Sequence, residues 1–219
     1  MGEKEHIKDK FWNLTGMKVQ SFSHPGLKNR DKTGNKTFLI ITDQRQKFIM
    51  TFRFNEAHAE LEAEVLKRLG NKNDSLPKLV NRSGNWLVQE YISGDRLSLA
   101  LAKTDKRKSY KIICNALSAL VDIQNDAKEI GFEKLVKPIC NNQSWRDERL
   151  SAFKSISEVS GLYAPKLDHQ NLSKALEIKP LSFIKWDARL GNGILRNNKK
   201  ICWFDWEHCG RRAGIDDLV

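Results

Sequence analysis

Long apolar runs, proline and closely spaced cysteines are all scarce in this sequence of 219 residues. Its longest apolar runs, such as residues 38–41, are far too short to cross a membrane as a helix. Only five residues are proline, whereas 40% are hydrophobic and 30% are charged, which excludes disordered and collagen-like chains. We therefore expect a chain that folds around its own core, as one domain or as two small lobes that share a cleft.

The cysteines and the N-terminus indicate a reduced, unprocessed protein. The two closest cysteines, Cys202 and Cys209, are seven residues apart, which matches no zinc or redox motif. Residues 1–6 are charged and lack the apolar segment of a secretory signal, and His6 breaks the pattern for myristoylation. The expected compartment is the cytoplasm, with Cys114, Cys140, Cys202 and Cys209 as thiols.

The formal net charge of +11 raises the question of a nucleic-acid partner. The excess is divided almost evenly between residues 1–92 and 93–219, with no dense basic stripe and no interleaved aromatic residues. A short basic cluster at residues 103–108 precedes an expected helix and fits a solvated face. The distribution argues against nucleic acid and agrees better with a small anionic partner such as a nucleotide.

The first part of the chain predicts strands around one helix. Residues 37–42, 47–54 and 86–92 are rich in β-branched and aromatic side chains, and residues 55–70 have the caps and apolar stripe of a helix, with Asn55 as N-cap. Alternation in the second strand places Phe48, Met50, Phe52 and Phe54 on one face and Ile49, Thr51 and Arg53 on the other.

The later part predicts helices followed by a small hairpin. One helical stripe contains Ile113, Leu117, Leu120 and Val121, and a second lies near residues 145–156. Two short apolar runs, 193–196 and 200–204, are separated by the turn residues 197–199. The order indicates an α+β protein with polar residues at both ends of its last hairpin.

Three oxygen-bearing side chains around that hairpin have the pattern of a phosphoryl-transfer site. Asp187 and Asn192 are five residues apart, and Asp205 directly follows the second strand of the hairpin. Transfer of a phosphoryl group needs an acidic group for the attacking hydroxyl, oxygen ligands for magnesium, and cations for the moving charge. The spacing therefore predicts that Asp187 serves the hydroxyl and that Asn192 and Asp205 hold the metal.

Around these residues the sequence resembles the aminoglycoside phosphotransferase and choline kinase-like group of small-molecule kinases. That group commonly has His-Gly-Asp-x-x-x-x-Asn in its catalytic loop and Ile-Asp-Trp-Glu at its metal site. This chain has Lys-Trp-Asp at 185–187, Gly-Asn at 191–192 and Phe-Asp-Trp-Glu at 204–207. The sequence 214–218, Gly-Ile-Asp-Asp-Leu, is similar to the turn that follows the metal motif.

The resemblance covers about residues 34–219 and implies a two-lobed protein kinase-like fold. Residues 1–92 form the expected nucleotide-binding lobe, an antiparallel sheet with one helix that ends in a hinge. Residues 93–219 form the expected catalytic lobe, mainly helical, with the catalytic hairpin. Family members usually continue beyond the position of Val219 into helices that line the acceptor pocket, so the chain is expected to be a minimal version or a fragment.

Roles for further residues follow from the same resemblance. Arg53 takes the place of the strand lysine that holds the α- and β-phosphates, and Glu62 the place of its helix partner. The segment 87–94 is similar to a hinge strand, in which we expect the Glu90 carbonyl and the Ile92 amide to contact adenine. Arg189, two residues after Asp187, is expected to offset charge on the γ-phosphate.

Several readings stay open for the weaker signals. Arg53 fits a solvent-exposed edge cation as well as a phosphate ligand, and Glu62 fits an exposed helix residue. Glu207 fits a turn cap or a ligand of a second magnesium ion. Gly26 and Gly34 fit ordinary turns as well as a phosphate-binding loop. Structural or surface roles are expected for Asp217, which anchors a loop, and for all five histidines: His6, His24, His58, His169 and His208.

These patterns predict an ATP- and magnesium-dependent phosphotransferase whose acceptor is a small hydroxylated molecule, such as an aminoglycoside, choline or a sugar. Lys185 in place of the family histidine changes the hydrogen bonds of the catalytic loop, and Arg53 in place of lysine changes the geometry of phosphate binding. These departures leave a second hypothesis open, that of a catalytically silent kinase-like module that binds nucleotide.

Overall fold

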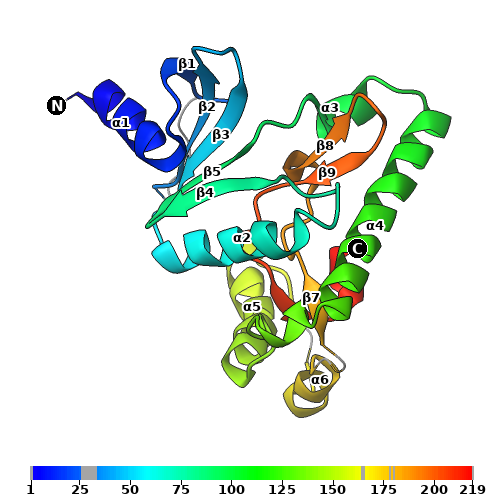
Figure 1. The fold of residues 1–219 in the computed structure, drawn as a ribbon. Helices are drawn as coiled ribbons and strands as arrows, with labels where there is room; N and C mark the ends of the chain where they lie inside the picture. Colours follow the sequence, from blue (N-terminus) through cyan, green and yellow to red (C-terminus); the bar gives the residue numbers. More distant parts are fainter. Residues whose placement is uncertain (1, 26–33, 164–165, 178, 180, 219) are drawn as a thin grey trace.

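The N-terminal region is built on a five-stranded antiparallel sheet. The computed structural model describes residues 2–25, 34–163, 166–177, 179 and 181–218 (Figure 1). The sheet has the order β1-β2-β3-β5-β4, and every neighbouring pair of strands is antiparallel. Its strands are β1 (Val19–Ser23), β2 (Lys36–Thr42), β3 (Lys47–Phe52), β4 (Leu79–Ser83) and β5 (Trp86–Glu90).

The two faces of the sheet have different roles, as the alternation in β3 predicts. Met50 is buried and Phe48 and Phe52 are half-buried in an apolar cluster, whereas Ile49, Thr51 and Arg53 line a cleft on the opposite face. The apolar face is covered by α1 (Glu3–Thr15), a helix that the sequence did not predict. The expectation of one helix in this region is therefore wrong, because its described residues form both α1 and α2. The helix α1 contributes Ile7, Phe11 and Leu14 to the cluster.

The second helix, α2 (Glu56–Leu69), begins where it was predicted to begin. The Asn55 side chain accepts a hydrogen bond from the backbone N–H of Ala57, so it caps the helix. Val65, Leu66 and Leu69 lie in the core that α2 shares with the C-terminal part of the chain. The apolar stripe thereby attaches the sheet region to the rest of the molecule.

The predicted strand at 47–54 is too long by two residues. The strand β3 ends at Phe52, and Phe54 is 71% exposed instead of lying on the buried face. The backbone N–H of Arg53 bonds to the carbonyl of Asn85, and Asn55 already caps α2. The chain must therefore turn at residues 53–55, which takes Phe54 out of register with the core.

Beyond Glu90 the chain is mainly helical, with two small sheets. The strands β6 (Gly94–Arg96), β8 (Gly193–Arg196) and β9 (Ile201–Trp203) form one sheet, in which β8 and β9 are the predicted hairpin. The strands β7 (Ser182–Ile184) and β10 (Gly210–Arg212) form the other. The helices are α3 (Leu97–Ala102), α4 (Lys106–Glu129), α5 (Gln143–Ser160) and α6 (His169–Ala175), with short 3-10 helices at Phe132–Lys134, Leu190–Asn192 and Gly214–Asp217.

The predicted apolar stripe of α4 is partly wrong. Ile113 is 42% exposed and Val121 is also exposed, whereas Leu120 is buried as expected. The buried face is made by Ala116, Ala119, Leu120, Ile123 and Ala127. Small alanine side chains allow the helix to approach the hairpin closely, and the indole of Trp203 donates a hydrogen bond to the carbonyl of Ala116.

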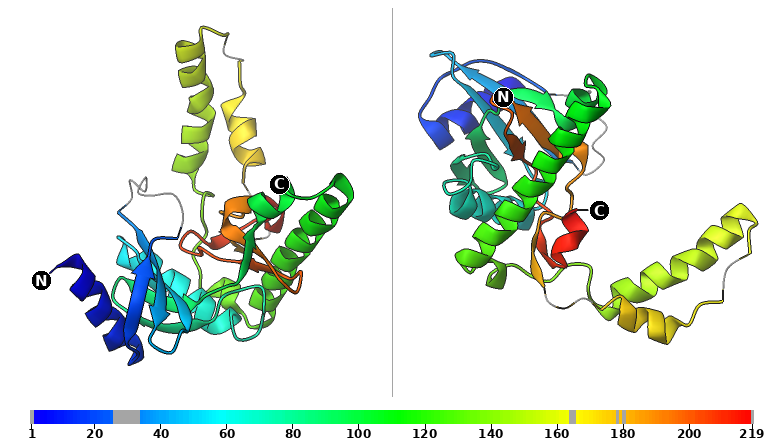
Figure 2. Two further views of the ribbon diagram at one scale, coloured as in Figure 1. Left: turned by 90° about the horizontal axis from the view of Figure 1, so that it is seen from above. Right: turned by 90° about the vertical axis from the view of Figure 1, so that its right-hand side faces the viewer.

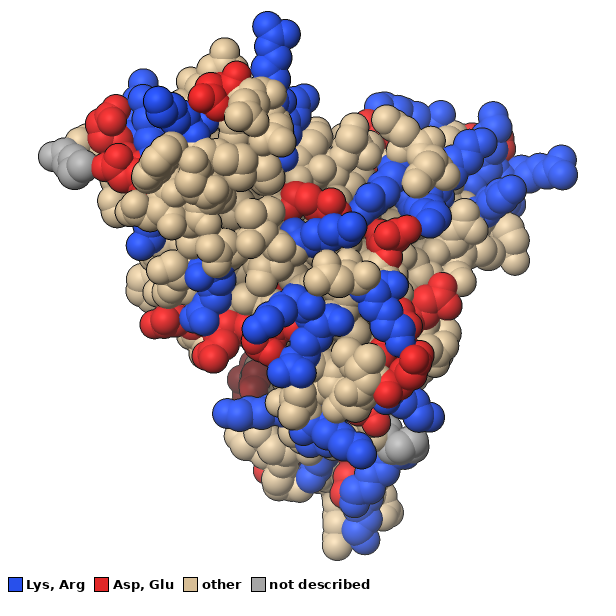
Figure 3. Space-filling model, viewed as in Figure 1, with Lys and Arg blue, Asp and Glu red and all other residues tan. Residues whose placement is uncertain are grey.

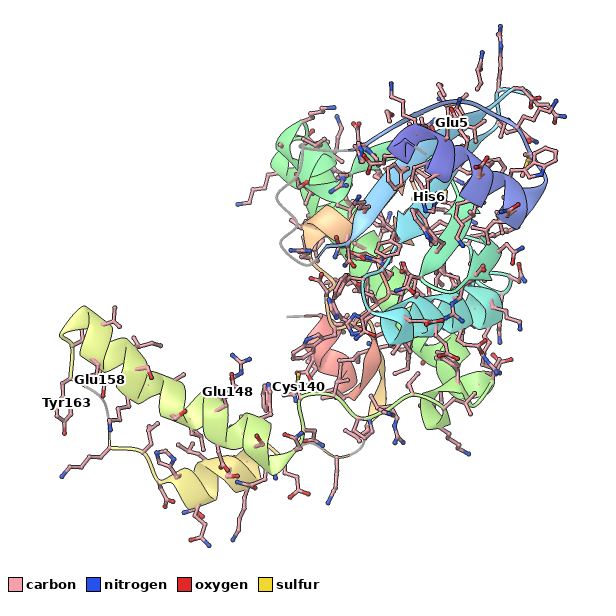
Figure 4. All side chains as sticks on the ribbon, turned by 90° about the vertical axis from the view of Figure 1, so that its left-hand side faces the viewer. Glu5, His6, Cys140, Glu148, Glu158 and Tyr163 are labelled. Atoms are coloured by element: carbon pink, nitrogen blue, oxygen red, sulfur yellow. The ribbon has the colours of Figure 1, made fainter. Side chains whose placement is uncertain are left out.

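The helices α5 and α6 form an arm that extends away from the body of the molecule (Figure 2). The predicted stripe near residues 145–156 is therefore not a core face, because Leu150 is the one residue of α5 that the structure buries. Phe153 and Ile156 are exposed on the arm. Cys140 lies where the arm joins the body, and Tyr163 lies at its far end (Figure 4).

The observed architecture agrees with the predicted α+β plan of a sheet region followed by a helical region with a hairpin. A division into lobes at residue 92 stays a prediction. In the described part of the chain, no helix has the combination of length and apolar character that a membrane crossing requires. On the face shown in Figure 3, Lys and Arg side chains are spread widely, with Asp and Glu between them.

We predict that α1 is essential to the stability of the sheet. Replacement Phe11→Ala removes a fully buried ring that contacts Phe48, with 5.8 Å between the ring centroids. We expect the free energy of unfolding, measured with urea, to fall by about 3–5 kcal/mol. The neighbouring Trp12, which is exposed, supplies the control: Trp12→Ala should cost about 1 kcal/mol or less. Equal effects of both substitutions would contradict a core role for α1.

Candidate active site

The cleft beside the sheet contains a buried ion cluster centred on Arg53. Its Nε donates to Glu62 Oε2 at 2.7 Å, its Nη2 lies 2.6 Å from Asp205 Oδ1, and its Nη1 lies 3.0 Å from Glu207 Oε1. Arg53 and Glu62 are 6% and 2% exposed. The predicted contact between Arg53 and Glu62 is therefore present, and the two readings as exposed surface residues are excluded.

Burial and the neighbouring charges shift the pKa values of the groups in this cluster. Burial opposes the positive charge of Arg53, but Glu62, Asp205 and Glu207 outweigh it and raise the pKa of the guanidinium above its usual value. Burial raises the pKa of Glu62, against the effect of Arg53. Burial also opposes ionisation of Asp205, but Arg53 and Lys185 lower its pKa below the usual range. Asp205 is therefore held as a carboxylate.

Asp187 and Asn192 meet directly, as their spacing predicts. Asn192 Nδ2 donates to Asp187 Oδ2 at 2.8 Å. The side-chain oxygen of Asn192, Oδ1, is an acceptor and takes no part in this hydrogen bond. Arg189, which is exposed, forms an ion pair with Asp187, with 3.2 Å between Nη2 and Oδ2. The three residues stand between β7 and β8, on the loop and the short helix that lead into the hairpin.

The hairpin brings Asp205 to the same region. The backbone N–H of Phe204 bonds to the carbonyl of Asn192 at 3.0 Å, so the end of β9 is fastened beside the beginning of β8. Asp205 follows with φ of 67°, in the left-handed region. This turn of the backbone directs the chain away from the hairpin and presents the carboxylate to Arg53.

Lys185 is buried and its side chain is hydrogen-bonded. It stands where the kinase family that the sequence resembles has a histidine. Its Nζ donates to the backbone carbonyl of Asp205 at 2.5 Å and lies 5.1 Å from the centroid of the Trp206 ring. Burial lowers the pKa of Lys185, against the attraction of Asp205 and Asp187. The amine thus joins the loop at residues 185–192 to the segment 204–207. A change in the hydrogen bonds at this position was predicted from the replacement of histidine by lysine.

Asp217 anchors the catalytic loop from behind, in agreement with its expected structural role. Its carboxylate accepts the backbone N–H groups of Lys185 and Trp186, each at 2.7 Å, and the Gln124 amide at 3.3 Å. Trp186 has φ of 70°, a conformation that is costly for a bulky side chain. The two hydrogen bonds to Asp217 hold the backbone in this conformation next to Asp187.

Two cavities meet at Asp187. The first, of about 620 Å³, lies between the sheet and the hairpin and is lined by Arg53, Glu62, Glu90, Ile92, Asp187, Arg189, Asn192 and Asp205, among others. All eight predicted site residues therefore face one cleft. The second cavity, of about 410 Å³, is lined by Ile139, Cys140, Trp186, Asp187 and His208. Asp187 and His208 belong to both linings.

The hinge-like segment forms one wall of the larger cavity. Glu90 is the last residue of β5, and its side chain pairs with Arg196 at 3.3 Å, whereas Ile92 is buried two residues later. The expected contacts of the Glu90 carbonyl and the Ile92 amide with adenine stay predictions. Gly34 has φ of 82° and precedes Asn35, which lines the same cavity; Gly26 lies outside the described residues.

Glu207 and two histidines form a group that the sequence did not reveal. Glu207 is buried and accepts hydrogen bonds from Asn35 at 3.1 and 3.2 Å, in addition to its ion pair with Arg53. His58 and His208 lie 3.6 and 3.7 Å from its two oxygens. His208 is exposed in a turn, as expected for a surface or loop residue, but it also lines both cavities. Its position directly after Glu207 in the metal motif was the available signal for a place at the cleft.

Two oxygen-bearing side chains of the cleft have the chemistry of metal ligands. Within the described residues, no group of three or more His, Cys, Asp and Glu side chains is arranged to hold a metal ion. Asp205 and Asn192 supply one carboxylate and one amide oxygen. That donor set fits magnesium, which prefers oxygen and is usually held by one or two carboxylates together with substrate phosphates and water.

Comparison with known proteins identifies the fold. No protein-family model matches the sequence, and no curated protein is similar to it in sequence. Among solved structures, the spectinomycin phosphotransferase APH(9)-Ia, in complex with ADP and spectinomycin, superposes with a TM-score of 0.65 at 12% identity, over 97% of this chain and 71% of that one. The gentamicin complex of APH(2″)-IIa has a TM-score of 0.62 at 16% identity, over 99% and 73%.

A macrolide phosphotransferase, the 2′-phosphotransferase MphH from Brachybacterium faecium, has a TM-score of 0.59 at 10% identity, over 97% of this chain and 75% of that chain. These likenesses show that the chain has the protein kinase-like fold of the aminoglycoside and macrolide phosphotransferases. The resemblance drawn from residues 185–187, 191–192, 204–207 and 214–218 is thus confirmed at the level of the fold.

We predict that Asp217 stabilises the protein by holding the catalytic loop. The substitution Asp217→Ala leaves two buried backbone N–H groups without their acceptor. We expect the free energy of unfolding, measured by chemical denaturation, to fall by about 3 kcal/mol. The exposed Asp122 on α4 supplies a matched control, for which Asp122→Ala should change stability by about 0.5 kcal/mol or less. Equal stability of the two variants would show that the loop is held by other contacts.

Proposed function

We propose that the chain is an ATP- and magnesium-dependent phosphotransferase that transfers the γ-phosphate to a hydroxyl group of a small molecule. The observation that supports this most strongly is the position of Asp187 in the linings of two adjoining cavities. A base for an acceptor hydroxyl has to reach the acceptor on one side and the nucleotide on the other. The proposal assigns the larger cavity to ATP and the smaller to the acceptor.

In this proposal Asp187 orients the acceptor hydroxyl and accepts its proton as the oxygen attacks the γ-phosphorus. Asn192 donates to one Asp187 oxygen, which fixes the direction of the carboxylate. Arg189 is exposed and paired with the same oxygen, so it lies close enough to offset charge that develops on the moving phosphoryl group. Asp187 and Arg189 are the proposed catalytic residues.

Asn192 and Asp205 are the proposed ligands of magnesium, which when bound neutralises charge on the β- and γ-phosphates. Arg53 is the proposed phosphate ligand, positioned by Glu62. Glu62 and Asp205 share its Nη2 atom, at 2.7 and 2.6 Å. If Asp205 turns from Arg53 to bind magnesium, one N–H of Nη2 becomes able to donate to a phosphate oxygen. The backbone groups of Glu90 and Ile92 complete the proposed nucleotide site.

Binding of nucleotide gives the first test of this proposal. Because ligand binding to the folded state raises stability, saturating ATP with magnesium should stabilise the protein by about 2.7 kcal/mol at a concentration of one hundred times Kd. We expect a clear rise in Tm in a thermal-shift assay, and loss of most of it when EDTA removes the metal. The variant Asp205→Asn should retain little of the magnesium-dependent rise. The absence of any shift in the unaltered protein would contradict the proposal.

Turnover gives the second test. ATP consumption is measured against a panel of sugars, amino alcohols and aminoglycosides, and the best acceptor is used for variants. Asp187→Asn should lower kcat by about 10²–10⁴-fold, because the amide cannot accept the hydroxyl proton, with nucleotide affinity nearly unchanged. Full activity of this variant would refute the assigned role of Asp187.

A silent nucleotide-binding module is the second candidate, and the contacts of Arg53 are the observation that favours it. All three nitrogens of the Arg53 guanidinium, Nε, Nη1 and Nη2, already contact carboxylates. In addition, Lys185 stands where the family that the sequence resembles has a histidine. A thermal shift with magnesium and ATP, without consumption of ATP on any acceptor, would favour this candidate. The two functions are thus separated by the same pair of experiments.

A further inference from the structure

The smaller cavity has a lining that is mainly apolar or weakly polar. Of the described residues that line it, Ile139, Cys140 and Trp186 are apolar or weakly polar, and Asp187 is the single carboxylate. Cys140 lies at the root of the arm formed by α5 and α6 (Figure 4). A volume of about 410 Å³ is within the range for small-molecule sites.

Trp186 is the largest of the described residues that line this cavity. It precedes Asp187 directly, and 37% of the residue is exposed. Its φ of 70° costs about 1–3 kcal/mol for a residue of this size, and such strain is retained mainly where surrounding contacts enforce it, commonly at functional sites. Here Asp217 enforces the conformation through the Trp186 backbone N–H, at 2.7 Å.

The buried side chain of Arg212 lies over the Trp186 ring. The Arg212 guanidinium lies 5.2 Å from the centroid of the Trp186 ring and 4.6 Å from that of Trp145. It also donates to the backbone carbonyl of Cys140 and pairs with Asp216 at 2.7 Å. Because Arg212 is buried, its charge is screened less than that of an exposed arginine.

The charges around this cavity are already paired with one another. Asp187 is paired with Arg189, and Asp216 with Arg212. Glu207, which lies next to His208 in the chain, is bound to Arg53. An acceptor with several ammonium groups needs carboxylates that are not engaged in this way, and an ammonium group placed on the Trp186 ring would meet the field of Arg212.

We infer that Trp186 determines the acceptor class, by supporting the apolar face of an uncharged hydroxylated ring. The inference rests on the proposed phosphotransfer function. Since Trp186 and Asp187 are adjacent in sequence and line one cavity, a ring that lies on the indole places an edge hydroxyl beside the Asp187 carboxylate. With the Arg212 guanidinium 5.2 Å from its centroid, the Trp186 ring favours C–H-rich, uncharged rings over ammonium groups. Among the described residues that line the smaller cavity, the single carboxylate, Asp187, is already paired with Arg189.

The experiment compares matched acceptors in a phosphotransfer assay with the purified protein, ATP and magnesium. Each uncharged compound is paired with an amino analogue: myo-inositol with 2-deoxystreptamine, glucose with glucosamine, and phenyl glucoside with phenyl 2-amino-2-deoxyglucoside as the larger pair. We expect uncharged members to be phosphorylated with kcat/KM at least tenfold above that of their amino partners.

Variants of Trp186 separate a supporting surface from a merely structural role. Trp186→Gly, which removes the indole and relieves the positive φ, should raise KM for the preferred acceptor at least tenfold with a smaller change in kcat. Trp186→Phe keeps an aromatic face and should restore KM to within about threefold. Trp12→Ala, on the exposed side of α1, should leave both constants unchanged. The dissociation constant for ATP with magnesium, measured by titration, should stay within about twofold in all three variants.

Different failures have different meanings. Preferential transfer to the amino compounds, or an unchanged KM in Trp186→Gly, overturns this inference and leaves the proposed function intact. Transfer to no compound of either kind, although ATP and magnesium bind, overturns the proposed phosphotransfer and the inference with it.

Discussion

The buried contact of Arg53 with three carboxylates is the interaction on which the arrangement of the cleft depends. It joins the end of β3 to α2 through Glu62 and to the segment after β9 through Asp205 and Glu207. Removing these charges from water costs several kcal/mol for each ion, and only full use of the guanidinium nitrogens repays that cost. A lysine, with its single ammonium, could not contact the three carboxylates in this fork geometry. The cluster therefore fixes how the sheet region faces the hairpin.

Hydrogen bonds to backbone groups place the remaining residues of the cleft. Phe204 bonds to the Asn192 carbonyl, Lys185 bonds to the Asp205 carbonyl, and Asp217 accepts two amides of the catalytic loop. These contacts come from four separate segments of the chain, yet each ends within a residue or two of an oxygen that faces the cleft. Preorganisation of this kind is what electrostatic catalysis requires, because the groups do not have to reorient during the reaction.

The sequence predicted those features that depend on local patterns. The cap at Asn55, the hairpin, the alternation in β3 and the spacing of Asp187 and Asn192 are each decided by neighbours in the chain, and the structure has all four. Other contacts between distant segments were missed. The helix α1 takes its place because the other face of the sheet is apolar, and Arg212 meets Trp186 only after β10 pairs with β7. Neither fact leaves a signal in a short window of sequence.

The net charge of +11 describes the surface and misleads about the cleft. Around Arg53 lie three carboxylates, Glu62, Asp205 and Glu207. Lys185, a second buried cation, also interacts with Asp205, but burial opposes its charge. A triphosphate without a counterion would therefore enter a region whose negative groups already equal or exceed its positive ones. In the proposed function, a divalent cation held by Asp205 and Asn192 would supply the positive charge that offsets this repulsion. On the proposed function, magnesium dependence is thus a consequence of the Arg53 cluster, and it would hold whatever hydroxyl group lies beyond Asp187.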